Sequence, residues 1–77
     1  LYAAYRSVAD AEHPAEGFVE LSKVRNRFVK LYEGYDPYTY KGKQYKSIKR
    51  AIEQMIKDHP NRIEFRETNL VTYLRMK

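Results

Sequence analysis

The spacing of apolar residues is helical in the first part of this chain and alternating in the last part. This order of patterns is the sequence feature that most constrains the possible folds. Three segments place apolar residues every three or four positions, which is the pattern of an amphipathic helix. We expect helices over residues 1–9, 23–32 and 46–57. Two later segments alternate apolar and polar residues on either side of Thr68-Asn69. They predict an antiparallel β-hairpin formed by residues 62–67 and 70–76.

Capping and helix-breaking residues divide these segments. Ser22 is a suitable N-cap for the second helix, and Gly34 ends that helix. Between the first two helices, residues 17–21 leave room for a strand of only two or three residues. Asp36-Pro37 joins a capping side chain to the residue best suited to a first helical position, so we expect one short helical turn there.

The order of these elements predicts a small α+β fold, a winged helix-turn-helix with three helices and a C-terminal β-hairpin as its wing. Seventy-seven residues fit a single domain over residues 1–77, and without cysteine only ordinary packing stabilises it. The first residue is not Met, which suggests a domain excised from a longer protein. The residues expected to be buried together are Val24, Phe28, Leu31, Ile48, Ile52, Ile63, Phe65 and Leu74.

Basic residues are concentrated in the middle of the chain. Residues 1–22 contain one basic and four acidic side chains. Residues 23–50 contain nine basic and two acidic side chains, and residues 51–77 contain five basic and four acidic ones. Clustered positive charge is typical of a protein that binds a polyanion, because each neutralised phosphate releases condensed counterions. The alternative explanation is a solvated surface that keeps the protein soluble.

The third predicted helix separates an apolar face from a basic one. Tyr45, Ile48 and Ile52 fall on one side of this helix, and cations gather on the other. In a winged helix the third helix is exposed, so its first turns would present their cations to a partner. The cations expected to make contact there are Lys46, Lys49 and Arg50.

Tyrosine is also clustered, because five of the eight tyrosines lie within residues 32–45, beside Lys41 and Lys43. Cations next to aromatic rings suit the binding of unpaired bases, which stack on the rings. We expect three of the rings to pack within the fold: Tyr32, Tyr35 and Tyr45. For Tyr38 and Tyr40, a stacking platform and a loop anchor remain equal alternatives.

The hairpin adds Arg62 and Arg66, which lie opposite its apolar residues and are expected to reach a phosphate from the wing. The complete set of predicted nucleic-acid-binding residues is Tyr38, Tyr40, Lys41, Lys43, Lys46, Lys49, Arg50, Arg62 and Arg66.

The sequence offers little chemistry for catalysis or for a metal. Asp10, Glu12 and Glu16 lie in or beside a segment that contains Pro and Gly, so we interpret them as a solvated loop and expect no catalytic site. His13 and His59 have no second ligand at metal-binding spacing, and no cofactor motif is present. Apolar runs of two or three residues cannot cross a bilayer, so we expect a soluble protein without a membrane partner. We separately expect a cytoplasmic location.

Three segments resemble the OST-HTH, or LOTUS, domain in the same order. They are residues 17–24, the Tyr35-Asp36-Pro37-Tyr38-Thr39-Tyr40 segment that leads into the third helix, and the closing residues 65–67 with 71–77. The resemblance covers nearly the whole chain. Members usually run from Tyr-Gly directly into the third helix, whereas residues 40–45 are longer here by about one residue.

This resemblance implies a non-catalytic RNA-binding module that is an accessory to a NYN-type ribonuclease domain or to an RNA-granule protein. It also implies G-rich or G-quadruplex RNA as the partner. One alternative is a protein-interaction module, in which the groove beside the first helix and the acidic 10–20 loop dock a DEAD-box helicase or a second copy. The second alternative is winged-helix binding of DNA.

Overall fold

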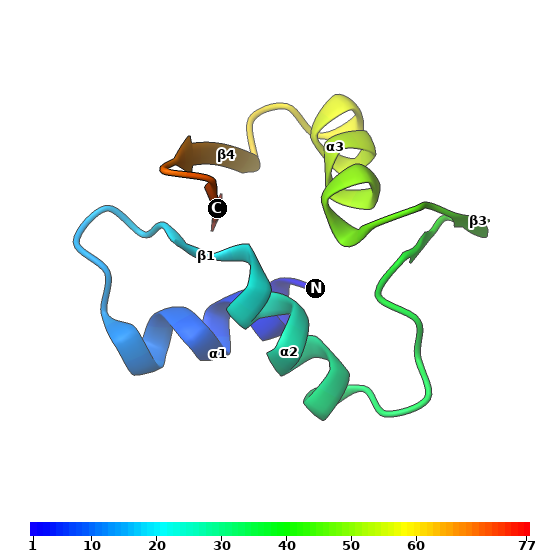
Figure 1. Cartoon of the computed structure of the whole chain (residues 1–77), viewed down its shortest axis with the longest axis horizontal. Coiled ribbons are helices and arrows are strands. Elements are labelled where there is room, and N and C mark those ends of the chain that lie inside the picture. Colours follow the sequence, from blue (N-terminus) through cyan, green and yellow to red (C-terminus); the bar gives the residue numbers. More distant parts are fainter.

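Three helices of eleven residues each form most of the regular secondary structure in a computed structural model that describes residues 1–77. They are α1 (Tyr2–Glu12), α2 (Leu21–Leu31) and α3 (Ile48–Asp58). Helices α1 and α2 pack side by side, and α3 lies across the molecule from them (Figure 1). The α+β class and the three predicted helices are confirmed.

The predicted hairpin is present and belongs to a three-stranded antiparallel sheet. Its strands are β1 (Val19–Glu20), β4 (Ile63–Thr68) and β5 (Val71–Met76), in the order β1-β5-β4. Leu74 at the centre of β5 is opposite both Val19 and Phe65. The short strand predicted before the second helix is therefore the edge that closes this sheet.

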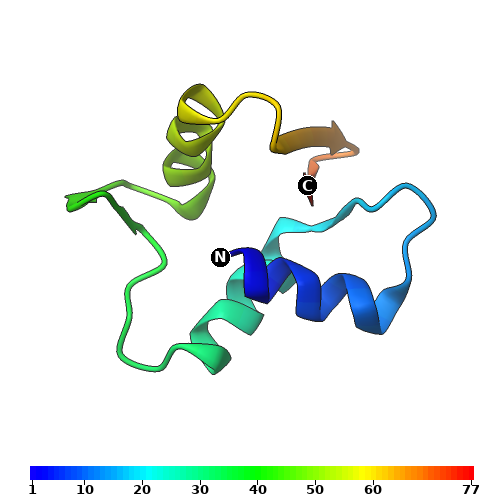
Figure 2. The ribbon, with the colours of Figure 1, turned by 180° about the vertical axis from the view of Figure 1, so that it is seen from behind.

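A second, separate ribbon projects from the connection between α2 and α3. It pairs β2 (Thr39–Tyr40) with β3 (Lys43–Gln44) in an antiparallel register. Figures 1 and 2 show the ribbon at the opposite end of the molecule from the three-stranded sheet. After Asp36-Pro37 the chain makes one hydrogen-bonded turn, in which the Thr39 N–H donates to the Asp36 carbonyl at 3.4 Å. The ribbon begins at Thr39, so this turn does not continue into a helix.

The local reason for the ribbon is a turn held by Asp36. The Asp36 carboxylate accepts hydrogen bonds from the Tyr38 backbone N–H at 2.8 Å and from the Gln44 side chain at 3.0 Å. Lys41 and Gly42 then both have positive φ, 50° and 78°, which is the geometry of a tight two-residue hairpin turn. The Asp side chain therefore closes a turn across the ribbon and does not cap a helix.

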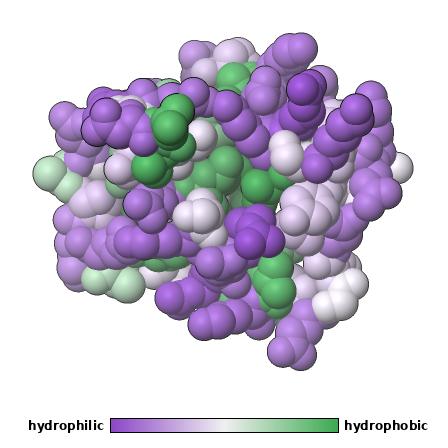
Figure 3. Space-filling view, viewed as in Figure 1, coloured by the Kyte–Doolittle hydropathy of each residue, from purple (hydrophilic) through white to green (hydrophobic).

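The core lies where α1, α2 and α3 meet the sheet. Ile52, Leu74, Val19 and Val24 are completely enclosed, and α1 adds four buried residues. On the face viewed in Figure 3, apolar groups gather near the middle of a surface that is otherwise hydrophilic. The core cluster consists of Ala4, Tyr5, Val8, Ala9, Val19, Leu21, Val24, Ile48, Ile52, Ile63 and Leu74.

Five of the eight predicted core residues are buried, and two more, Phe28 and Phe65, are half-buried against the cluster. The eighth, Leu31, is 49% exposed. It is the last residue of α2, where the chain leaves the core, so the prediction for Leu31 is wrong. Two tyrosine predictions fail in the same region, because Tyr35 is 73% exposed and Tyr32 is exposed beside Phe28. Tyr45 is half-buried.

The ends of the helices differ from the predicted ends for local reasons. Helix α1 continues to Glu12 and stops at His13, which has a left-handed φ of 50° just before Pro14. Helix α2 begins at Leu21 with Glu20 as its N-cap, so the prediction of Ser22 is wrong. Because β1 runs into α2 without a linker, the last extended residue is already Glu20 and Ser22 is helical.

Helix α3 and the hairpin turn shift by one or two residues. Ser47 caps α3 by accepting a hydrogen bond from the Arg50 backbone N–H at 3.3 Å, so Lys46 precedes the helix. In the hairpin, Thr68 pairs with Val71, and the turn is Asn69-Leu70, not Thr68-Asn69. Leu70 therefore lies in the turn and not on the apolar face of β5.

Candidate nucleic-acid interface

The nine predicted contact residues lie in three places, which the structure only partly brings together. Four are on or next to the β2–β3 ribbon, three surround the start of α3, and two are at or beside β4. The ribbon and α3 contact each other, so the first seven residues belong to one region. Arg66 is on β4 and contacts the loop between α1 and β1, which separates it from the other residues.

Tyr40 and Lys41 attach the ribbon to the end of α3 through Asp58. The Tyr40 hydroxyl donates a 2.7 Å hydrogen bond to Asp58 Oδ2, and Lys41 Nζ lies 3.3 Å from the same oxygen. These hydrogen bonds lower the pKa of Asp58, with the Tyr40 bond as the largest cause, and raise the pKa values of Tyr40 and Lys41. The charge of Lys41 is therefore already paired within the fold.

Tyr38 is built into the loop. Its ring packs against the hydrophobic core, its backbone N–H donates to Asp36, and its carbonyl accepts a 2.8 Å bond from the Tyr45 N–H. These contacts are those of a loop anchor. Tyr40 remains half-exposed and keeps part of its ring available to a partner.

The exposed face of α3 and the residue before its N-cap carry cations that have no carboxylate partner. Lys46, Arg50 and Lys57 are exposed and make no ion pair, and Glu53 is the one acidic residue between them. Lys43 on β3 is also free of ion pairs, and its ammonium lies 5.2 Å from the centre of the Tyr45 ring. We call these four unpaired cations, which lie on α3, just before it and on the ribbon that contacts it, the α3–ribbon surface: Lys43, Lys46, Arg50 and Lys57.

Lys49 differs from its neighbours on α3. It forms an ion pair with Glu67 at the end of β4, and this contact is the main cause of a raised pKa for Lys49. The pair connects α3 to the hairpin. It also neutralises the charge of Lys49, which the sequence predicted to contact a nucleic acid.

Arg66 is also engaged within the fold, whereas Arg62 is not. The Arg66 guanidinium lies 2.6 Å from the Glu16 carboxylate and 4.2 Å from the centre of the Phe18 ring. Arg75 approaches the same ring at 4.7 Å. Hydrogen bonding to Arg66 lowers the pKa of Glu16. Arg62 is exposed and has no ion pair.

The acidic residues at the end of α1 and in the loop after it are exposed, as predicted, but they also form ion pairs, and Asp10 and Glu12 are helical. Asp10 pairs with Arg6, Glu12 with Lys23, and Glu16 with Arg66, each at 2.6 Å. Three acidic residues in the chain have no cation within ion-pair distance: Glu33, Asp36 and Glu53. The cations without a carboxylate partner are Arg25, Arg27, Lys30, Lys43, Lys46, Arg50, Lys57 and Arg62.

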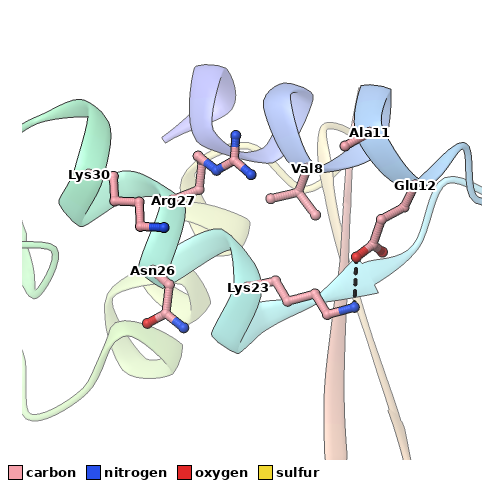
Figure 4. Close-up of a pocket in the computed structure, with 7 residues that line it drawn as sticks. All are labelled: Val8, Ala11, Glu12, Lys23, Asn26, Arg27 and Lys30. Atoms are coloured by element: carbon pink, nitrogen blue, oxygen red, sulfur yellow. Dashed lines mark hydrogen bonds and ion pairs between the residues drawn. The ribbon is translucent and has the colours of Figure 1, made fainter.

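A second basic feature, absent from the predicted set, is the groove between α1 and α2. Lys23, Arg27 and Lys30 line it with Asn26, opposite residues of α1 (Figure 4), around a cavity of about 200 Å³. Lys23 is paired with Glu12, and Arg27 donates a 2.8 Å hydrogen bond to Ser7 Oγ. The four- and three-residue spacing of these cations is visible in the sequence, but their position opposite α1 is not.

The structure shows no cluster of three or more His, Cys, Asp or Glu side chains that could hold a metal ion. None of its helices has the length and apolar character needed to cross a membrane.

Comparison with known proteins found no relative: the chain matches no family model, no curated protein and no solved structure. Its function is therefore inferred from the residues and contacts described above.

Proposed function

We propose that this chain is a non-catalytic RNA-binding module that contacts RNA through the α3–ribbon surface. The observation that carries this proposal is the charge left over after the ion pairs form. Eight cations remain without a carboxylate partner, against three acidic residues without a cation. Four of these cations lie on α3, just before it or on the ribbon that contacts it. Phosphates suit such a surface, because their neutralisation releases counterions.

The order of the elements supports a winged-helix fold of the OST-HTH type. Three helices precede a hairpin, and β1 joins that hairpin in one antiparallel sheet. Helix α3 then corresponds to the recognition helix, with β4 and β5 as the wing. The connection from α2 to α3 spans residues 32–47 and holds the ribbon, whereas a DNA-reading helix-turn-helix has a short turn of about 3–4 residues.

This long connection favours RNA over duplex DNA as the partner. It places half-exposed Tyr40 and the cation of Lys43 next to α3, where unpaired bases would stack and their phosphates would be neutralised. The family resemblance favours G-rich or G-quadruplex RNA, and a cytoplasmic role as an accessory to a nuclease or an RNA-granule protein.

The proposal is tested by fluorescence anisotropy of labelled G-quadruplex RNA, unstructured RNA and duplex DNA at several salt concentrations. A triple variant, Lys46→Gln with Arg50→Gln and Lys57→Gln, removes three exposed cations from the surface. Each lost phosphate contact is expected to reduce the slope of log affinity against log salt by about 0.7 for a single strand, or about 2 in total.

A matched control removes three unpaired cations from α2: Arg25→Gln, Arg27→Gln and Lys30→Gln. Because both variants lose the same charge, an equal effect on the slope would indicate a general charge effect and contradict a localised surface. A larger effect of the α2 variant would assign RNA to the α1–α2 groove. Circular dichroism confirms that each variant is folded, and tighter binding of duplex DNA would favour the DNA-binding alternative.

A protein-docking function is the second candidate, and exposed apolar residues at the end of α2 support it. Val29, Leu31, Tyr32 and Tyr35 are all exposed in this region. The acidic loop of residues 10–20, which the sequence favoured for docking, has its carboxylates paired internally. A DEAD-box helicase or a second copy would be recognised with little salt dependence, which pull-down and light scattering at several salt concentrations measure.

A further inference from the structure

A cavity of about 400 Å³ lies between the start of α1, the ribbon, the end of α3 and the β4–β5 hairpin. Its apolar wall combines two aromatic rings, two thioethers and one aliphatic side chain: Tyr2, Tyr40, Met55, Ile63 and Met76. Its volume falls within the range of about 300–1,000 Å³ that is typical of small-molecule sites. Flat aromatic and polarisable sulfur groups favour a planar aromatic ligand.

Two cations, Arg62 and Lys77, and the imidazole of His59 complete the lining of this cavity. The Lys77 ammonium is 3.3 Å from Glu64, so this charge is already paired, whereas Arg62 has no carboxylate partner. A ligand that joins a planar ring to an anion would therefore match the apolar wall and the Arg62 charge together.

The backbone around Arg62 is ordered before any ligand binds. The Arg62 N–H donates to the His59 carbonyl at 3.1 Å, and the Arg62 carbonyl accepts from the Lys77 N–H at 2.8 Å. The opposite wall is held by the hydrogen bond from Tyr40 to Asp58 at 2.7 Å. Both ends of the cavity are therefore positioned in advance, which reduces the entropy lost on binding.

We propose that this cavity takes one unstacked nucleotide of an RNA strand, with its base against Tyr2, Tyr40 and the two methionines and its phosphate on Arg62. The inference rests on the proposed RNA-binding function and extends it from a charged surface to a defined nucleotide site. Tyr40 belongs both to the cavity wall and to the ribbon, so a strand bound on the α3–ribbon surface would reach the cavity without a break.

The two methionines of the chain make the test specific. Met55 and Met76 are the only methionines present, and both line the cavity, so carbon-13 labelling of their methyl groups reports on this site alone. The probes are the four ribonucleoside monophosphates, ribose 5-phosphate, inorganic phosphate and phosphotyrosine. We expect ring-current shifts of both methyl signals with at least one nucleotide, and none with ribose 5-phosphate or inorganic phosphate, which lack an aromatic ring.

Arg62→Gln is expected to weaken nucleotide binding about tenfold or more, because it removes a charge-assisted hydrogen bond to the phosphate. Arg25→Gln, the matched control, removes an unpaired arginine from α2 and should leave the affinity unchanged. Neither arginine belongs to the buried core.

Several outcomes would overturn the nucleotide site. One is that the methyl signals do not shift at millimolar nucleotide. Another is that ribose 5-phosphate or phosphotyrosine shifts them as much as nucleotide does. The last is that Arg62→Gln leaves the nucleotide affinity unchanged. The site and the proposed surface fail separately. If RNA binding depends on salt but the methionine methyl signals do not shift, only the proposed nucleotide site in the cavity is rejected. If the methyl signals shift with nucleotide but RNA binding does not depend on salt, only the proposed α3–ribbon surface is rejected.

Discussion

Lys49 on α3 forms an ion pair with Glu67 at the end of β4, so a cation of the predicted recognition helix is used to connect that helix to the hairpin. Both side chains remain substantially exposed, and water and salt screen the pair. The pair therefore changes the charge that α3 presents more than it stabilises the fold.

Replacing Glu67 with Gln should release Lys49 toward a bound polyanion. We expect tighter RNA binding and a salt slope steeper by up to about 0.7, the value of one added single-strand phosphate contact. Anisotropy titrations at several salt concentrations measure both quantities. Glu33→Gln is the matched control, because Glu33 has no cation partner and lies outside α3. An equal gain in both variants would mean that only net charge matters.

The core predicts a clear order of stability effects. Ile52 is fully buried, and Ile52→Ala should lower the free energy of unfolding by about 2–5 kcal/mol. Phe28 is only half-buried at the end of α2, so Phe28→Ala should cost less than the roughly 3–5 kcal/mol of a fully buried phenylalanine. Urea unfolding checks this order, with exposed Val29→Ala as a control; a larger loss for Phe28 would contradict the core described here.

The hairpin turn contains a leucine in a strained backbone conformation. Leu70 is fully exposed and has a φ of 66°, a region that costs a non-glycine residue about 1–2 kcal/mol. Leu70→Gly should raise the free energy of unfolding by about 0.5–1 kcal/mol, because glycine relieves this cost but makes the unfolded chain more flexible. Leu70→Ala keeps the strain and should change little. A lower melting temperature for Leu70→Gly would show that its side chain stabilises the fold.

Acid pH should weaken the contact between the hairpin and the α1–β1 loop. Arg66 holds the pKa of Glu16 below its ordinary value, so the unfolded state takes up a proton at a higher pH than the folded state. The stabilisation is therefore complete above the ordinary glutamate pKa and is lost as pH falls through the lowered value. Arg66→Gln should raise the pKa of Glu16, measured by NMR titration, and Lys57→Gln should not. A Glu16 pKa unchanged by Arg66→Gln would contradict this cause.

The sequence by itself determined the identity and order of the helices and the hairpin, because these depend on local spacing of apolar residues. The stripes around Val24 and Ile52 and the alternation around Leu74 place these three residues in the core, where the structure has them, whereas Leu31 at the end of its stripe is exposed. Local patterns were less informative at the ends of elements. The hairpin turn is at Asn69-Leu70, one residue later than the predicted Thr68-Asn69, because the alternation of apolar and polar residues alone does not distinguish these two positions.

The tertiary structure decided which side chains remain available at the surface. Glu16 and Arg66 are fifty residues apart in sequence, and Tyr40 and Asp58 are eighteen apart, yet each pair is in contact. The numbers of charged and aromatic residues can be counted from the sequence. Which of these side chains form ion pairs or hydrogen bonds with each other depends on long-range packing, which the spacing of apolar residues does not encode. For this reason the sequence located the basic region, and only the folded chain separated Lys46 and Arg50, which are free, from Lys41 and Lys49, which are paired.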